Sequence, residues 1–205
     1  MDSLREQEEI KYSKIWEFSQ YRLHSPGLTY IEEAAKNLGM EEGDHVLDVG
    51  CGSGKTSEWL CEKGMFVHGI DIANNAVNEV MVDRPNFYFS QECCWQLSQK
   101  VTETDWVICT DVLEHLPEKM VHPTLHQLSK KIKKGGFFSI CCIPDSFGPK
   151  YINQSLHLTV RSARWWADQL GRYWTISWDQ PSSSNDVLIL VHPRKEKKIE
   201  WPKRD

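Results

Sequence analysis

One stretch constrains the fold of this chain more than any other: residues 45–54, which read His-Val-Leu-Asp-Val-Gly-Cys-Gly-Ser-Gly. Val46–Val49 has the length and β-branched content of a buried strand, and a helix is predicted from about Ser53 to Glu62. Three alternate glycines separate the two elements. Because glycine lacks Cβ, such a turn can take positive φ and let a ligand lie against bare backbone. In a doubly wound sheet this turn lies at the carboxyl end of a strand, where nucleotide-like ligands bind.

Two familiar glycine motifs fit this turn poorly. A phosphate loop needs a glycine five positions before its Gly-Lys-Ser/Thr triplet; the triplet is present at 54–56, but position 49 is Val. A dinucleotide fingerprint needs Gly-x-Gly-x-x-Gly, and the residue three positions after Gly52 is Lys55. An NAD-dependent enzyme on a related fold therefore remains only as a disfavoured alternative.

Asp48, two residues before the first glycine, completes a different pattern. The string resembles the first motif of class I S-adenosylmethionine-dependent methyltransferases, an acidic residue followed by Gly-x-Gly-x-Gly. The resemblance covers roughly residues 28–193. It implies that the acid lies near the amino acid moiety of the cofactor and that the turn passes beneath it. The cofactor residues implied by this motif are Asp48, Gly50, Cys51, Gly52 and Gly54.

A second acid follows at the end of the next predicted strand, Phe66–Asp71. Asp71 lies about 20 residues beyond the glycine turn, the spacing at which a carboxylate accepts both ribose hydroxyls. The alternative is that Asp71 is the N-cap of a helix predicted at Asn74–Val82. We favour the ribose contact, and we place the adjoining Ile72 in the cofactor site as well.

The resemblance is weaker at the predicted adenine contact. A third strand, residues 86–90, leads to Gln91-Glu92-Cys93-Cys94-Trp95. Relatives often place here an acid that accepts the adenine amine, followed by a small residue. In register, Cys93 takes the place of the acid and Cys94 that of the small residue. Backbone amides or Glu92 are the possible substitutes for the missing acid.

The candidate catalytic residues follow the fourth and fifth predicted strands. Residues 105–110 form the fourth strand and bring Thr110 and Asp111 to the cofactor. Asp111-x-x-Glu114-His115 resembles the Glu-His-Leu signature of small-molecule methyltransferases, where this loop borders the methyl group. His157 is placed at the acceptor by the same resemblance. We therefore predict Glu114, His115 and His157 as catalytic residues, although Glu114 and His115 also suit the cap of the following helix.

A metal-dependent alternative uses the same residues. The chain is also similar to small-RNA 2′-O-methyltransferases, which hold a divalent metal with Glu-x-x-Glu-His and a later His. Asp111, Glu114, His115 and His157 occupy those places, and oxygen and imidazole ligands suit Mg²⁺ or Mn²⁺. Asp is shorter than the expected Glu, and the acidic chain lacks a broad basic surface for RNA. We predict no metal.

The remaining pattern predicts the architecture. Strands and helices alternate, as in an α/β, doubly wound, seven-stranded and mostly parallel sheet with an antiparallel last strand. We expect an N-terminal helical cap at 1–27, a methyltransferase domain at 28–193 and a charged tail at 194–205. Within these regions we predict a helix at 3–24, a helix from Pro117 to Lys134 stopped by two glycines, and an irregular loop at 144–160. Four residues of the cap are candidates to line the site, namely Tyr12, Trp16, Tyr21 and Arg22.

Composition limits the classes of binding partner and the compartment that we expect for this chain. The chain has 205 residues and a net charge of −5, so no global cationic field attracts nucleic acid or membrane. Lysines and arginines cluster at 130–134 and 194–204, which we interpret as a solvated helix end and a solvated tail. Seven cysteines without a Cys-x-x-Cys motif favour a reduced, cytoplasmic compartment over a disulfide framework. The N-terminus has no signal-peptide pattern, and no apolar run reaches the ~20 residues of a membrane span.

From these patterns we predict an S-adenosylmethionine-dependent methyltransferase that acts on a small molecule at oxygen or nitrogen. A metal-dependent RNA methyltransferase and a non-catalytic cofactor-binding module are the alternatives.

Overall fold

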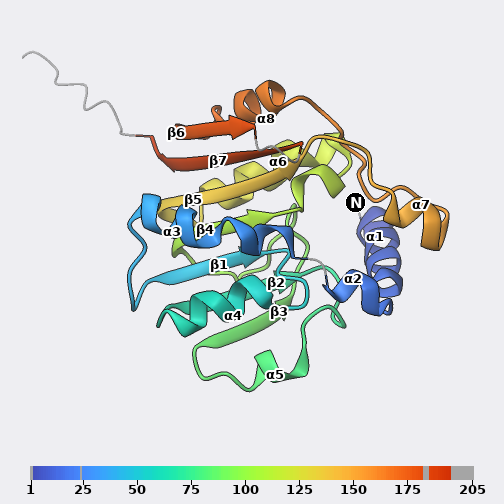
Figure 1. Cartoon of the computed structure of the whole chain (residues 1–205), viewed down its shortest axis with the longest axis horizontal. Helices are drawn as coiled ribbons and strands as arrows, with labels where there is room; N and C mark the ends of the chain where they lie inside the picture. The colour runs from blue at the N-terminus through green and yellow to red at the C-terminus, as the bar shows by residue number, and fades with distance from the viewer. Residues whose placement is uncertain (1, 24, 182–184, 195–205) are drawn as a thin grey trace, which may run out of the picture.

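The computed structural model describes residues 2–23, 25–181 and 185–194. A seven-stranded sheet with strand order β3-β2-β1-β4-β5-β7-β6 forms its centre (Figure 1). β7 runs antiparallel to both of its neighbours, and the other pairings are parallel. This confirms the predicted fold class. The strands are β1 (His45–Val49), β2 (Phe66–Asp71), β3 (Phe87–Gln91), β4 (Thr104–Thr110), β5 (Ile132–Cys141), β6 (Trp174–Pro181) and β7 (Asp186–Pro193).

Side-chain alternation along the strands divides the core into two layers, as the period of two requires. Val46, Ile108 and Phe137 face the layer beneath helices α3 (Ile31–Leu38) and α4 (Lys55–Glu62). Their chain neighbours Leu47 and Phe138 face the opposite layer, beneath α6 (Glu118–Ser129) and α8 (Ala163–Leu170). Both faces of the sheet are therefore covered, and the ends of its strands are left for a site.

The helices of the N-terminal region are shorter than predicted. The helix expected at 3–24 is two helices, α1 (Asp2–Ile15) and α2 (Ser19–Leu23), followed by a 3-10 turn, η1 (Pro26–Thr29). The break falls at Trp16, whose carbonyl accepts a hydrogen bond from Nε of Arg22 at 2.8 Å. Because an arginine replaces the next helical donor, the chain can turn there without leaving that carbonyl unsatisfied.

Arg22 also explains why the helix predicted at Asn74–Val82 is reduced to α5 (Glu79–Val82). Its Nη1 donates to the carbonyl of Ala76 at 2.9 Å and to Oδ1 of Asn78 at 3.0 Å. The cap of α5 is Asn78, so the interpretation of Asp71 as a helix N-cap was wrong.

Three further expectations were wrong downstream. The helix predicted to end at Lys134 ends at Ser129, and the strand β5 already begins at Ile132. Lys134 is not at a helix end, because it lies in β5; its half-exposed side chain pairs with Asp44, with Nζ 2.5 Å from Oδ1. The loop expected at 144–160 contains a helix, α7 (Phe147–Ile152). Earlier in the chain, before α6, residues Leu113–His115 form a 3-10 turn, η2. The Ser-rich connection at 182–184 and the tail from 195 lie outside the described residues.

Helices α1, α2 and α7, which lie outside the two layers that cover the sheet, mark the position of the site. Figure 1 shows α1, α2 and α7 gathered at the carboxyl ends of the parallel strands, the edge at which doubly wound sheets bind ligands. Among the described helices, none combines the length and apolar character needed to cross a membrane.

Candidate active site at the carboxyl ends of the strands

The glycine turn has the backbone that its sequence predicts. Gly50, Gly52 and Gly54 have φ of 66°, 54° and 90°. A Cβ on Gly50 would lie 2.3 Å from a methyl of Val112, and one on Gly52 would lie 2.6 Å from the ring of Trp16. Glycine is therefore required at both positions for conformation and for space.

Two cavities open above this turn. The first, which we call the β3-side cavity, extends from the ends of β2 and β3 to α1. The second, the histidine-side cavity, extends from the glycine turn to the loops after β4 and β5. Five residues line both cavities, so the two are halves of one site: Trp16, Tyr21, Gly50, Asp111 and His115.

The two predicted cofactor acids lie on either side of the turn. Asp48 lines the histidine-side cavity and accepts a hydrogen bond from Oγ of Ser57 at 2.6 Å. Asp71 lines the β3-side cavity and accepts from the backbone N–H groups of Gly52 at 3.1 Å and Ala73 at 2.9 Å. Burial raises the pKa of each carboxyl to about 6, since a low-dielectric surrounding disfavours the charged form.

The other predicted cofactor residues are divided between the walls. Cys51, Gly52 and Thr110 line the histidine-side cavity, and Ile72 and Cys94 line the β3-side cavity. Gly54 lines neither cavity; it is the N-cap of α4. Cys93 is fully buried and lines neither cavity, so its thiol does not reach the site.

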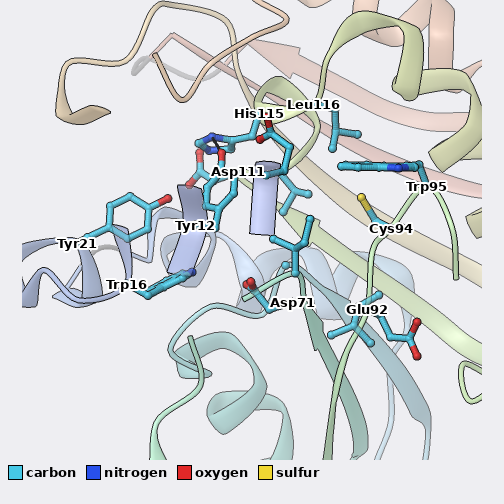
Figure 2. A pocket seen from close by; sticks show the side chains of 15 residues that line it. Tyr12, Trp16, Tyr21, Asp71, Glu92, Cys94, Trp95, Asp111, His115 and Leu116 are labelled. Atoms are coloured by element: carbon cyan, nitrogen blue, oxygen red, sulfur yellow. Dashed lines mark hydrogen bonds between the residues drawn. The ribbon is translucent and has the colours of Figure 1, made fainter. Parts of the chain in front are cut away.

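Glu92, the proposed substitute for that acid, lines the β3-side cavity but is held by its own loop. Its carboxylate accepts from the backbone N–H of Ser98 at 3.1 Å and from the hydroxyl of the same residue. In Figure 2 the carboxylate points away from the centre of the pocket. Trp95, which the sequence analysis did not assign to the site, lines this end beside Cys94 and Leu116.

The N-terminal helices supply one wall. Tyr12, Trp16 and Tyr21 line the β3-side cavity, and Figure 2 shows them opposite Cys94 and Trp95. Three of the four candidate lining residues thus reach the site. The fourth, Arg22, lines neither cavity and instead stacks on Trp16, with its guanidinium carbon 5.8 Å from the ring centroid.

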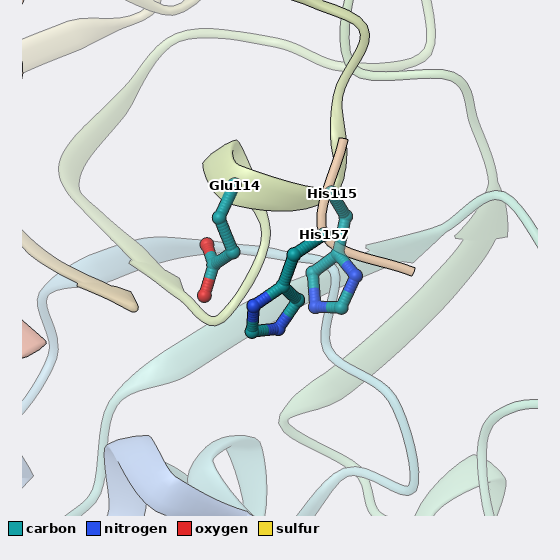
Figure 3. A group of neighbouring side chains, drawn as sticks. All are labelled: Glu114, His115 and His157. Carbon is teal, nitrogen blue, oxygen red and sulfur yellow. The ribbon is translucent and has the colours of Figure 1, made fainter. Parts of the chain in front are cut away.

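Two histidines meet in the histidine-side cavity. Figure 3 shows His115, from η2, beside His157, from the loop after α7; their ring centroids are 4.8 Å apart and the planes nearly perpendicular. Nδ1 of His157 lies 2.6 Å from the carbonyl oxygen of Ile143. Because a carbonyl only accepts, Nδ1 carries the hydrogen, and Nε2 of the neutral ring keeps its lone pair.

His115 is held from two sides. Its Nδ1 lies 2.8 Å from the Tyr12 hydroxyl and 3.2 Å from the carbonyl oxygen of Leu156. Burial, followed by the nearby His157, lowers the pKa of His115 to about 3. His115 is therefore neutral over the physiological pH range and contributes a polar but uncharged edge to the site.

Glu114 lies beneath the histidines and lines neither cavity. It is fully buried, and its Oε1 accepts from the backbone N–H of Cys141 at 2.9 Å. Its carbonyl oxygen accepts from the N–H groups of Leu158 and Thr159, which fixes the loop that carries His157. Burial and the neighbouring Asp111 raise the pKa of Glu114 well above its ordinary value, which favours the protonated form of its carboxyl.

Asp111 has φ of 54° and lines both cavities. Glu114, His115 and His157 each offer one ligand atom within 4.8 Å of the others. Burial favours the protonated form of Glu114, and this carboxyl would have to lose its proton to bind a cation, since metal ligands bind in deprotonated form. The cluster is compatible with a metal ligand set without requiring one.

Comparison with known proteins agrees with this geometry. Residues 46–136 match the family described as a methyltransferase domain. Ubiquinone biosynthesis O-methyltransferase from Coxiella burnetii is 32% identical over 118 residues, which are 55% of this chain and 48% of the relative. The protein of the same name from Azoarcus sp. is 36% identical over 107 residues, 47% of this chain and 44% of the relative. The matches thus span about half the length of these curated relatives.

Solved structures share the fold. Magnesium protoporphyrin IX methyltransferase from Synechocystis PCC 6803, with bound S-adenosylhomocysteine, superposes with a TM-score of 0.62 at 20% identity, covering 82% of this chain and 84% of the other. The 1,6-didemethyltoxoflavin-N1-methyltransferase of Burkholderia thailandensis gives a TM-score of 0.63 at 16% identity, covering 82% and 77%. Together with the strand order, these superpositions show that the chain shares the fold of these methyltransferases, and residues 46–136 carry its match to the methyltransferase domain family.

Proposed function

We propose that this protein transfers a methyl group from S-adenosylmethionine to oxygen or nitrogen of a small-molecule acceptor. One observation carries the proposal: the glycine turn and the histidine pair open into cavities that share five lining residues. A cofactor laid along the turn and a second molecule beside His157 would therefore be neighbours in one site. Bound S-adenosylmethionine supplies an electrophilic methyl group on a sulfonium.

The residues of this chain fit that cofactor. The glycine turn offers a surface free of Cβ atoms, and Asp48 and Asp71 offer carboxylates on opposite sides of it. The rings of Trp16 and Tyr21 meet edge-on, with their centroids 4.8 Å apart, and both residues line the two cavities where these join. Aromatic rings attract a cation by about 0.5–2 kcal/mol. Methyl transfer is an in-line displacement, in which the protein contributes chiefly proximity and orientation, worth up to about 7–11 kcal/mol.

His157 is the proposed base where the acceptor must lose a proton. Its Nδ1–H donates to Ile143, which leaves Nε2 to accept the acceptor's proton. His115 stays neutral beside it, so the pair does not carry two positive charges. Glu114 acts by holding the loop of His157 rather than by touching the acceptor.

The lining supports a neutral or cationic small molecule as the acceptor. None of the described residues that line either cavity is Lys or Arg, whereas Asp48, Asp111 and Asp145 line the histidine-side cavity. Burial opposes ionisation of Asp145, but hydrogen bonds from the backbone N–H groups of His157, Gly148 and Leu156 lower its pKa overall. An anionic phosphate backbone would meet acidic groups here, which disfavours RNA.

The metal-dependent RNA 2′-O-methyltransferase remains the second candidate, because Glu114, His115 and His157 do cluster. We further propose a cytoplasmic location: all seven cysteines are free thiols, which a reducing compartment preserves.

Calorimetry tests the cofactor first. S-adenosylmethionine and S-adenosylhomocysteine are expected to bind and NAD is not; binding of NAD alone would refute the assignment. A screen of neutral phenols, amines and heterocycles with methyl-labelled cofactor then tests transfer. Cofactor binding without transfer to any acceptor class, RNA included, would favour the non-catalytic module.

A further inference from the structure

A shallow groove between α8 and β6 lies apart from the candidate active site. None of the described residues that line it lines either of the two cavities. Its floor is apolar: Ala167 and Trp174 are buried, and Ile176 is half-buried. Its rim carries three exposed arginines, namely Arg164, Arg172 and Arg194. The groove therefore combines an apolar floor with a cationic rim.

The groove is basic although the chain as a whole carries a net charge of −5. Asp168 is the one acid among the described residues that line it, and it pairs with Arg164, whose Nε lies 3.2 Å from Oδ1. Nη1 of Arg172 lies 2.6 Å from Nε2 of His122. Because a guanidinium has five N–H donors, these contacts leave donors of both arginines for an anion. The chain directly after Arg194 reads Lys-Glu-Lys-Lys, so the positive charge continues along the sequence.

The edge of the sheet supplies a second binding element. β6 is last in the strand order and has β7 as its one neighbour among the described strands (Figure 1). An edge strand presents N–H and C=O groups that can pair with an added strand. Trp174 and Ile176 of β6 pack in the core layer beneath α8. The side chains of an added strand alternate in the same way, so every second one would lie on the side of α8 and its arginines.

We propose that this groove binds an extended, acidic segment of a partner protein, which adds to β6 as a further strand. Alternate carboxylates of that segment would face the rim arginines, which makes the charges of the two surfaces complementary. Arginine suits this role because its planar fork binds a carboxylate through two parallel hydrogen bonds. The phosphates of a nucleic acid would also attract these arginines, but a nucleic acid has no peptide groups to pair with a sheet edge. The free edge of β6 thus favours a protein segment.

The probe is a short peptide of alternating Glu and Thr, which is acidic on one face when it is extended. Calorimetry with the wild-type protein measures its dissociation constant. A peptide with Lys in place of Glu should not bind. Two further peptides carry N-methyl groups on alternate amides, each in one of the two phases; the one that cannot donate to β6 should bind at least about tenfold more weakly. Raising the salt concentration from about 0.05 M to about 0.5 M should weaken the acidic peptide, because salt screens exposed charges.

Matched variants test the arginines. Arg164→Gln and Arg194→Gln keep a long polar side chain and remove the charge. Each should raise the dissociation constant of the acidic peptide roughly twofold to fivefold, the effect of one exposed ion pair. Lys36→Gln, at an exposed position on α3, is the control and should bind the peptide like the wild type. All three variants should keep the wild-type affinity for S-adenosylhomocysteine, so the result does not depend on the proposed function.

The outcomes separate the possible occupants. The proposal is overturned if the wild-type protein binds no acidic peptide, or if it binds the acidic and basic peptides equally well. If both N-methylated peptides bind like the parent peptide, the segment does not add to β6 and the proposal also fails. A single-stranded RNA that binds more tightly than the acidic peptide, and that loses affinity in Arg164→Gln, would assign the groove to nucleic acid instead.

Discussion

The hydroxyl of Tyr12, in α1, lies 2.8 Å from Nδ1 of His115, in the turn after β4. The two residues are 103 positions apart, and their rings also meet edge-on with centroids 5.8 Å apart. This contact fastens the N-terminal helix across the site and orients one of the two histidines. The pKa of Tyr12 is raised by burial and by neighbouring charges, so the phenol keeps its hydrogen at neutral pH.

Tyr12→Phe is therefore expected to affect turnover more than folding. The ring and its edge contact remain, but His115 loses one of its two Nδ1 partners, a hydrogen bond worth about 0.5–1.5 kcal/mol. We expect kcat to fall roughly threefold to tenfold while the affinity for S-adenosylhomocysteine changes less than twofold. Steady-state kinetics and calorimetry measure these quantities, with the exposed Tyr88 changed to Phe as control. An unchanged kcat would show that this contact does not orient the histidine for catalysis.

A pair of glycine substitutions separates backbone strain from loss of the site. Gly39 ends α3 with φ of 73° and has open space where a Cβ would stand, whereas Gly50 has φ of 66° and its Cβ would meet Val112 at 2.3 Å. Gly39→Ala should cost about 1–2 kcal/mol of unfolding free energy from conformation alone. Gly50→Ala should cost more and abolish measurable cofactor binding. Chemical denaturation and calorimetry report both; equal effects of the two variants would contradict the steric argument.

We expect Asp71 both to support the glycine turn and to bind the cofactor, and substitution can distinguish these two roles. Its carboxylate accepts from Gly52 and Ala73, and we propose that it also accepts the ribose hydroxyls. Asp71→Ala should therefore lower the melting temperature and weaken S-adenosylhomocysteine binding roughly tenfold to hundredfold, the worth of hydrogen bonds to a charged group. Asp71→Asn keeps one backbone acceptor and should recover part of the stability but little of the affinity. A variant that loses stability while binding normally would show that the residue only supports the turn.

The raised pKa of Asp48 predicts how the stability of the fold changes with pH. Burial raises its pKa from 3.8 to about 6 in the folded protein. The protonated form is thus favoured by folding, and the stability that it contributes is present below pH 3.8 and is lost as pH rises through about 6. Asp48→Asn keeps an acceptor for Ser57 and does not titrate. Between about pH 4 and pH 7 the wild type should lose on the order of 1–3 kcal/mol relative to the variant. Denaturant unfolding at both pH values measures this difference, and a constant difference would contradict it.

His157 separates the metal-free mechanism from its metal-dependent alternative. As the proposed base, His157→Ala should lower kcat by ~10²–10⁴-fold, the usual contribution of general acid–base catalysis, and leave the cofactor affinity intact. A chelator should not change the wild-type rate. His126→Ala, at an exposed position on α6, is the control. Loss of activity with chelator, restored by Mg²⁺ or Mn²⁺, would instead assign Glu114, His115 and His157 to a metal.

Local pattern in the sequence was enough for the sheet and for the position of the glycine turn and its two neighbouring acids at the strand ends. The glycine turn, Asp48 and Asp71 are placed by short spacings around buried strands, and such strands bring their carboxyl ends to one edge whatever else the chain does. Alternation of strands and helices likewise predicted a seven-stranded sheet with an antiparallel last strand.

Only the tertiary structure decided the elements whose local preference is overridden by distant partners. Residues 132–134 belong to β5 because Ile132 pairs with Thr104 and Lys134 reaches Asp44. Helix α5 is short because Arg22, more than fifty positions away, takes the carbonyl of Ala76.

The tertiary structure also decided the histidine side of the site. Nothing in the spacing of Tyr12, His115 and His157 brings them together; the docking of α1 and of the loop after α7 onto the strand ends does. Which of Cys93, Cys94 and Trp95 faces the pocket also depended on how one turn, closed by Gln96 donating to Cys93, packs against the sheet. Local preferences are set by neighbours in the chain, whereas the orientation of a side chain in a cavity is set by residues that only folding brings near.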